Sequence, residues 1–155
     1  MTPSQQAYAY VLTYELDQLI ESPQPFVPFT HPGAPYRGDK FTLIGQTTDD
    51  LRWLLKNVCG YLNQLGITFK VGTRQLIEQA NAEQRLKLVT VYMNTDTNAQ
   101  ALFDDLWYLT REYTGHQGAT LQYSQHRGGC IYYRRDTDPQ GRYIPASATA
   151  AAEGY

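Results

Sequence analysis

The spacing of apolar residues along the chain predicts long helices separated by short strands. Between residues 48 and 65, apolar residues recur at intervals of three and four, which is the spacing of one helix face. The polar run at 48–50 (TDD) is typical of a helix start, and Gly66 is typical of a helix end. The apolar stripe consists of Leu51, Leu54, Leu55, Val58, Cys59, Leu62 and Leu65.

Three further helices follow from the same spacing. One is predicted over residues 98–113, and Gly115 ends it. An amphipathic helix is predicted over residues 3–20, and a shorter polar helix over 73–84. The apolar positions of the 98–113 helix are Ala99, Leu102, Phe103, Leu106, Leu109 and Tyr113.

Short runs rich in β-branched and aromatic residues predict five strands. These runs cover residues 40–45, 67–71, 86–93, 119–124 and 130–134. A turn at 125–129 joins the last two into a C-terminal hairpin. We therefore expect an α+β fold, in which two strand–helix–strand segments share one mixed, mostly antiparallel sheet covered by the two long helices.

The chain is expected to form one domain. Its 155 residues suffice for a single core, and we assign residues 1–145 to it. Residues 21–38 carry five prolines and are predicted to be an extended connector over the surface, because proline disfavours helix. Residues 146–155, rich in small side chains, are predicted to be a flexible tail.

Composition and charge exclude several classes of protein. The formal net charge of −2 argues against a nucleic-acid partner. No apolar run is long enough for a membrane span, so we expect a cytoplasmic protein. Cys59 and Cys130 lie far apart, and His31, His116 and His126 all fall in predicted loops, so neither a metal site nor a disulfide framework is expected. The 13 tyrosines are typical of a small sheet edged with aromatic rings.

Basic residues at the predicted strands are the candidates for chemistry. Lys40 begins the first strand, Lys70 lies in the second and Arg134 ends the last. Two lysines and an arginine on one side of a sheet would bind phosphate, and could lower the pKa of one lysine towards that of a base. Alternatively, the two lysines point outward on edge strands, where their charge discourages pairing with another chain. This is the commoner role of such residues.

The order of these segments resembles a known family. The segments are residues 40–43 (KFTL), 61–70 (YLNQLGITFK), 88–92 (LVTVY) and 128–134 (GGCIYYR). Together they resemble the lyase domain of class III and class IV lanthipeptide synthetases, which is similar to bacterial effector phosphothreonine lyases. They also resemble type III effector-like proteins found beside standalone lanthipeptide enzymes. The resemblance covers about residues 40–135.

The resemblance implies a β-elimination of phosphate from phosphoserine or phosphothreonine in a peptide, with no metal or organic cofactor. By position, Lys70 matches the base that removes the α-proton, and Lys40 matches the helper lysine. Arg134 matches an arginine that holds the phosphate. Further candidates for binding the phosphate are Arg127, Arg135 and Tyr132.

One departure from the family pattern affects the expected function. The family has a histidine two residues after the first lysine, where this chain has Thr42, and a threonine hydroxyl is a poor proton donor to phosphate. We therefore expect a lyase-like domain that binds a phosphorylated peptide or a protein partner, with catalysis reduced or lost. The alternatives are an active standalone lyase working with a separate kinase, and a non-enzymatic effector or accessory protein that binds another protein through residues 23–28 (PQPFVP).

Overall fold

The computed structural model describes residues 16–145. The predicted tail and most of the predicted N-terminal helix lie outside this range. The helices are α2 (Leu16–Ile20), α3 (Thr48–Asn57), α4 (Cys59–Gln64), α5 (Arg74–Gln79) and α6 (Ala99–Leu109), with a short 3-10 turn, η2 (Gln84–Leu86). The strands are β1 (Phe26–Phe29), β2 (Tyr36–Ile44), β3 (Phe69–Gly72), β4 (Lys87–Asn94), β5 (Gln125–Gly128) and β6 (Ile131–Arg135).

The strands form one sheet in the order β1-β3-β4-β2-β6-β5. The predicted α+β class is confirmed, but the sheet has six strands instead of five, and it is antiparallel throughout instead of mixed. The reason is that the two strand–helix–strand units interleave. β4 lies between β2 and β3, and β2 lies between β4 and β6, so the parallel strands of each unit never pair directly.

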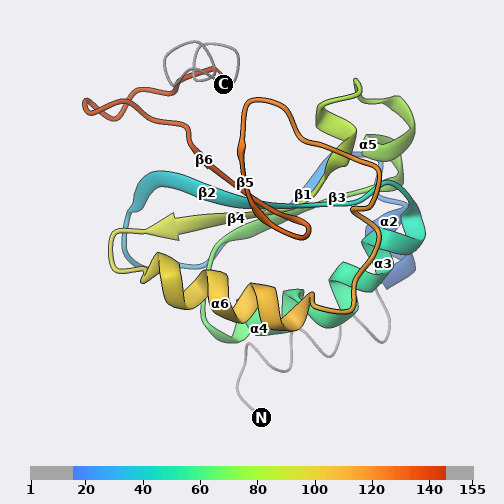
Figure 1. The fold of residues 1–155 in the computed structure, drawn as a ribbon, viewed down its shortest axis with the longest axis horizontal. Coiled ribbons are helices and arrows are strands. Elements are labelled where there is room, and N and C mark those ends of the chain that lie inside the picture. The colour runs from blue at the N-terminus through green and yellow to red at the C-terminus, as the bar shows by residue number, and fades with distance from the viewer. Residues whose placement is uncertain (1–15, 146–155) are drawn as a thin grey trace.

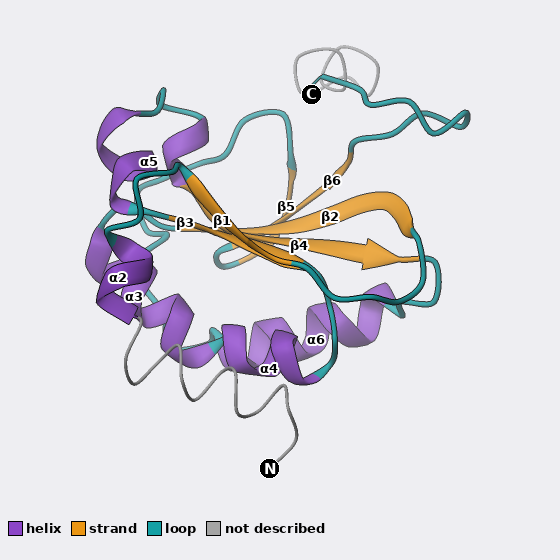
Figure 2. Ribbon diagram, turned by 180° about the vertical axis from the view of Figure 1, so that it is seen from behind, coloured by secondary structure: helices purple, strands orange, loops and turns teal. Residues whose placement is uncertain are grey.

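The helices α3, α4 and α6 cover one face of the sheet (Figures 1 and 2). We call this side the helix-covered face. The core fills the space between it and the helices, and is built from strand residues such as Leu43 and Phe69 and helix residues such as Leu54 and Leu106. Within residues 16–145, the opposite face carries no long helix; the C-terminal segment, residues 136–145, rises from the sheet on that side (Figure 1).

The predicted helix at 48–65 is divided in two. Val58 has φ −121° and ψ −42°, which ends α3 and lets α4 begin at the next residue. The capping residue is Thr47, whose side chain accepts from the backbone of Asp50 while the Asp50 carboxylate accepts from the backbone of Thr47. Both short helices nevertheless bury the predicted stripe as far as Leu62, so the pattern identified the packed face, but Leu65 is 54% exposed.

The proline-rich segment is more than a connector. Residues 26–29 form β1, which pairs with β3 at the edge of the sheet, and Pro28 stands opposite Lys70. An edge strand tolerates proline because only one of its sides needs hydrogen-bond donors. Phe29 stacks on Phe69 with ring centroids 4.8 Å apart, which fastens this edge to the core.

The strand predicted at 119–124 is wrong. That segment is irregular, with a turn at 122–123, and Tyr123 has a positive φ of 60°, which interrupts an extended strand. The strand pairing with β6 is β5, in the stretch predicted as a turn. Gly128 and Gly129, with φ of 150° and 54°, form the tight connection, and a Cβ on either would lie 3.0–3.1 Å from the ring of Trp107.

Candidate functional site

The strand register places several predicted site residues on one face of the sheet. Lys70 in β3 stands opposite Thr90 in β4, which stands opposite Thr42 in β2. Thr42 in turn stands opposite Tyr132 in β6, and Tyr132 opposite His126 in β5. Residues opposite one another across a ladder lie on the same face of a sheet. This face is the one opposite the helices, and we call it the cationic face.

A second row on the cationic face brings Lys40 and Arg134 together. Lys40 stands between Arg134 in β6 and Tyr92 in β4. Side chains two residues apart on a strand share a face, so Lys40 joins Thr42, and Arg134 joins Tyr132. Lys40, Lys70, Arg134 and Tyr132 therefore all belong to the cationic face.

The other two predicted phosphate-binding residues lie on the helix-covered face. Arg135 follows Arg134 directly and must point the opposite way, where it approaches the carboxylate of Asp39 at 3.8 Å. Arg127 stacks on Tyr133, with its guanidinium carbon 4.5 Å from the ring centroid. The structure thus divides the predicted phosphate site between two faces.

Lys87, at the start of β4, is a residue that the sequence analysis did not select. It is half-buried, and its pKa is lowered to about 8 by burial, by Lys40, and by the charges of Arg134 and Lys70, against the opposing effect of Glu83. Lys87 is thus electrostatically coupled to the other three cations. We call Lys40, Lys70, Lys87 and Arg134 the cation cluster. Sequence spacing gave no signal for Lys87, because an irregularity in the pairing of β2 with β4 separates it from the regular alternation.

Lys70 lies against aromatic rings. Its Nζ is 4.1 Å from the centroid of the Phe26 ring and 6.0 Å from that of Tyr92. Burial and the charge of Lys40 lower the pKa of Lys70, while Asp136 acts to raise it. A lysine with a lowered pKa gives up its proton more readily than an exposed one, which is what a general base requires.

Asp136 is the internal counter-ion of the cluster. Its carboxylate lies 3.1 Å from the Nζ of Lys40 and accepts a 2.5 Å hydrogen bond from the hydroxyl of Tyr36. The chain then turns back, and Ile144 donates from its backbone to the carbonyl of Asp136. Arg134 donates to the carbonyl of Ile144. The C-terminal segment therefore borders the cation cluster at one end.

The position of the missing histidine lies in the floor of this face. Thr42 is only 4% exposed and sits between Lys70 and Tyr132 in the cross-strand row. The nearest histidine in the row is His126, two strands away, whose ring lies 4.7 Å from that of Tyr132 and whose Nε2 is 2.9 Å from the carbonyl of Gly129. Among residues 16–145, no imidazole lies at the position of Thr42.

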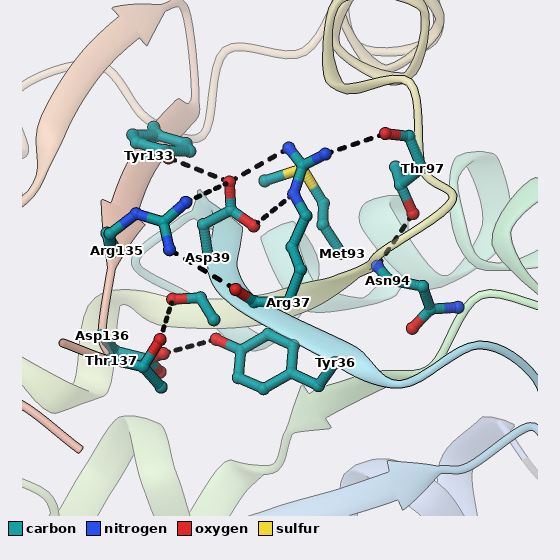
Figure 3. A network of polar contacts seen from close by, with 11 residues as sticks. Tyr36, Arg37, Asp39, Met93, Asn94, Thr97, Tyr133, Arg135, Asp136 and Thr137 are labelled. Carbon is teal, nitrogen blue, oxygen red and sulfur yellow. Dashed lines mark hydrogen bonds and ion pairs between the residues drawn. The ribbon is translucent and has the colours of Figure 1, made fainter. Parts of the chain in front are cut away.

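On the helix-covered face, Asp39 is the centre of a polar network (Figure 3). Its carboxylate accepts two hydrogen bonds from Arg37, at 2.7 and 3.0 Å, and one of 2.9 Å from the hydroxyl of Tyr133. Arg37 also donates to the carbonyl of Thr97, which fixes its guanidinium in place. Burial acts to raise the pKa of Asp39, but these hydrogen bonds outweigh it and the pKa is lowered.

Other kinds of site find no support in the described part of the chain. Residues 16–145 contain no group of three or more histidine, cysteine, aspartate or glutamate side chains placed to hold a metal ion. Cys59 and Cys130 are both buried and free, and burial raises the pKa of each thiol. Over the same residues, no helix has the length and apolar character needed to cross a membrane.

Comparison with models of known protein families gives no match, and comparison with curated proteins gives none either. The function must therefore be argued from the geometry of the two faces.

Proposed function

We propose that this protein is a lyase-like domain that binds a peptide through a phosphorylated serine or threonine, held at the cation cluster. One observation carries the proposal: strand register gathers Lys40, Lys70 and Arg134 on one sheet face, and Lys87 is electrostatically coupled to all three. Among the described residues, the carboxylates that act on these lysines are those of Asp136 and Glu83. Half-buried cations that outnumber their counter-ions raise the free energy of the empty site. A phosphate dianion would relieve that cost.

The chemistry around the cluster suits a phosphorylated side chain. Arg134 can offer a planar guanidinium to phosphate oxygens, and the lysines supply compact point charges. The rings of Phe26 and Tyr92 flank Lys70 and would contact the aliphatic part of the bound residue. Asp136 already pairs with Lys40 and so competes with the ligand. On binding, its carboxylate would have to move away or interact with Lys40 together with the phosphate.

The natural test is titration with a phosphothreonine peptide and its unphosphorylated counterpart, followed by calorimetry. We expect the phosphorylated form to bind at least about tenfold more tightly, because charge-assisted hydrogen bonds contribute about 1.5–3 kcal/mol each. Replacing Arg134→Gln should remove most of that preference. The matched control is Arg135→Gln, one residue away on the other face, which should leave the preference intact.

Equal affinity for the two peptides would overturn the proposal, and so would equal losses from the two arginine variants. Because Arg134 is only 4% exposed, its replacement can also disturb folding. The half-buried Lys70→Gln serves as the second variant, with circular dichroism as the check on folding.

Elimination of the phosphate is the second candidate function. The lowered pKa values of Lys70 and Lys87 favour it, because each lysine is closer to the range of a base. Thr42 argues against a fast reaction, since general acid catalysis contributes about 10²–10⁴-fold. Mass spectrometry of the phosphopeptide after incubation distinguishes binding alone from elimination, because elimination removes phosphoric acid from the peptide.

We expect the unmodified protein to release phosphate slowly or not at all. Thr42→His should raise the rate, and adding Lys70→Ala should abolish the gain. Fast release by the unmodified protein would make the lyase the leading function.

A further inference from the structure

A cavity lies on the helix-covered face, between α6 and strands β2 and β6. Its volume is about 330 Å³, within the range of small-molecule sites. Phe41 and Phe103 give it aromatic walls, with ring centroids 6.2 Å apart and planes tilted by 46°. Tyr133 completes the aromatic lining, with its ring 5.9 Å from that of Phe41. We call this cavity the aromatic–arginine pocket.

The charged residues at this pocket leave an excess of positive charge. Arg37 and Arg127 line it, and Arg135 lies beside it against Asp39. Both oxygens of the Asp39 carboxylate accept from Arg37, and one also accepts from Tyr133, so this single anion is fully engaged (Figure 3). Three guanidinium groups therefore stand against one carboxylate.

Arg127 is the cation available to a ligand. It is exposed, and its guanidinium rests on the face of the Tyr133 ring. Within residues 16–145, it forms neither an ion pair nor a side-chain hydrogen bond. Its planar fork could therefore turn all its donors to an incoming anion while the stacking on Tyr133 is kept.

We propose that the aromatic–arginine pocket binds an aromatic anion: a single ring that carries a carboxylate or a phosphate. The ring packs against the wall formed by Phe41, Phe103 and Tyr133, where edge-to-face contacts are favourable. The anionic group pairs with Arg127, while Arg37 is held rigid by Asp39 and Thr97 at the inner end. This site is separate from the cation cluster, since the sheet lies between the two.

The same chemistry has two sources, a free aromatic acid or an aromatic residue of a peptide. Benzoate and phenyl phosphate probe the first. A short peptide with a C-terminal phenylalanine probes the second, and its C-terminal amide is the uncharged control. Amide chemical shifts of the full chain, followed by NMR during titration, locate each probe and give its affinity.

We expect shifts confined to Ala99, Gln100, Phe103 and Tyr133, with benzyl alcohol binding more weakly than benzoate. Arg127→Gln should lower the affinity by about fivefold or more, the loss of a charge-assisted pair. Arg111→Gln is the matched control, because Arg111 is also an exposed arginine stacked on a tyrosine, 4.0 Å from the Tyr108 ring. It should change nothing.

A second variant tests the shape of the pocket without changing its charge. Ala99 lines the cavity at the start of α6, so Ala99→Leu should fill part of it and weaken binding. Shifts at Thr42 and Thr90 in place of these residues would overturn the proposal, and so would equal affinity for benzoate and benzyl alcohol. Binding unaffected by both Arg127→Gln and Ala99→Leu would do the same.

Discussion

Two faces of one sheet carry charge in opposite ways, although neighbouring residues of the same strands build both. Asp39 and Lys40 are adjacent in β2, and Arg134 and Arg135 are adjacent in β6, yet alternation sends them to different faces. On the helix-covered face, a buried carboxylate is enclosed by fixed donors. On the cationic face, four cations share few counter-ions. The Asp39 network stabilises a buried charge, whereas the cation cluster leaves positive charge available, as the exposed Arg127 does at the aromatic–arginine pocket.

The pKa shifts express the same difference. Hydrogen bonds lower the pKa of Asp39 in spite of its burial, so the folded protein stabilises the charged carboxylate. Burial and like charges lower the pKa of Lys87 and Lys70, so the folded protein disfavours their charged forms. A group whose charge costs free energy in the empty protein is a reasonable place for a ligand of opposite charge.

The largest effect is expected from Asp39→Asn. The change removes the charge that Arg37, Arg135 and the Tyr133 hydroxyl all face, and hydrogen bonds to a charged group typically contribute about 1.5–3 kcal/mol each. The free energy of unfolding, measured by urea titration at pH 7, should fall by that order. Because the pKa of Asp39 is lowered on folding, its contribution exists above the unfolded pKa and is lost as the pH falls through the folded one.

The control for Asp39 is Asp17→Asn. Asp17 pairs with Arg52 at 2.7 Å, but its side chain is 80% exposed, so its replacement should leave stability nearly unchanged. If the free energy of unfolding falls by the same small amount in both aspartate variants, the Asp39 network contributes no more than a surface ion pair. The contrast between the two faces would then be wrong.

A smaller effect is expected from the adjacent tyrosines of β6. Tyr133→Phe removes a hydrogen bond to the Asp39 carboxylate and should lower the free energy of unfolding by about 1.5 kcal/mol, the lower end for bonds to charged groups. Tyr132→Phe removes a hydroxyl on the cationic face for which the described residues provide no hydrogen-bond partner. Thermal unfolding of the two variants gives the comparison directly. A larger loss for Tyr132→Phe would contradict it.

The sequence predicted those parts of the molecule that depend on periodicity. The apolar stripes of α3, α4 and α6 gave the packed faces of these helices, and a stripe depends on spacing within one element, which is local information. The grouping of Lys40, Lys70 and Arg134 came from the order of three segments and a family resemblance, and spacing alone left open whether the lysines point outward; the strand register places all three on one face.

What the sequence missed depends on contacts between distant segments. The strand β1 forms because Phe29 stacks on Phe69, although prolines in the segment argue against a strand. Arg127 and Arg135 were grouped with Arg134, whereas the bulge in β5 and the alternation in β6 turn both to the other face. The Asp39 network joins residues 37 and 133, far apart in the chain, and no local pattern marks it.

The smallest effect concerns Lys87, and it depends on pH. Its pKa is about 8 in the folded protein and about 10.5 when unfolded, so the unfolded state binds more protons between those values. The free energy of unfolding therefore rises with pH in that window. To separate this from the titration of other groups, the wild type is compared with Lys87→Met, whose side chain has a similar length and no charge.

Between pH 7.5 and pH 9.5, the free energy of unfolding of the wild type should rise by about 1 kcal/mol relative to that of Lys87→Met. This value is reduced for the solvent screening of a half-buried side chain. The exposed Lys56→Met is the control, and its difference from the wild type should stay constant over the same range. Phosphopeptide affinity should move the other way, weakening as Lys87 loses its proton, and Lys87→Met should remove that dependence. A stability difference that does not change with pH would mean that Lys87 keeps an ordinary pKa. Folding would then not disfavour the charged form of Lys87, and the contrast with Asp39 on the helix-covered face would be lost.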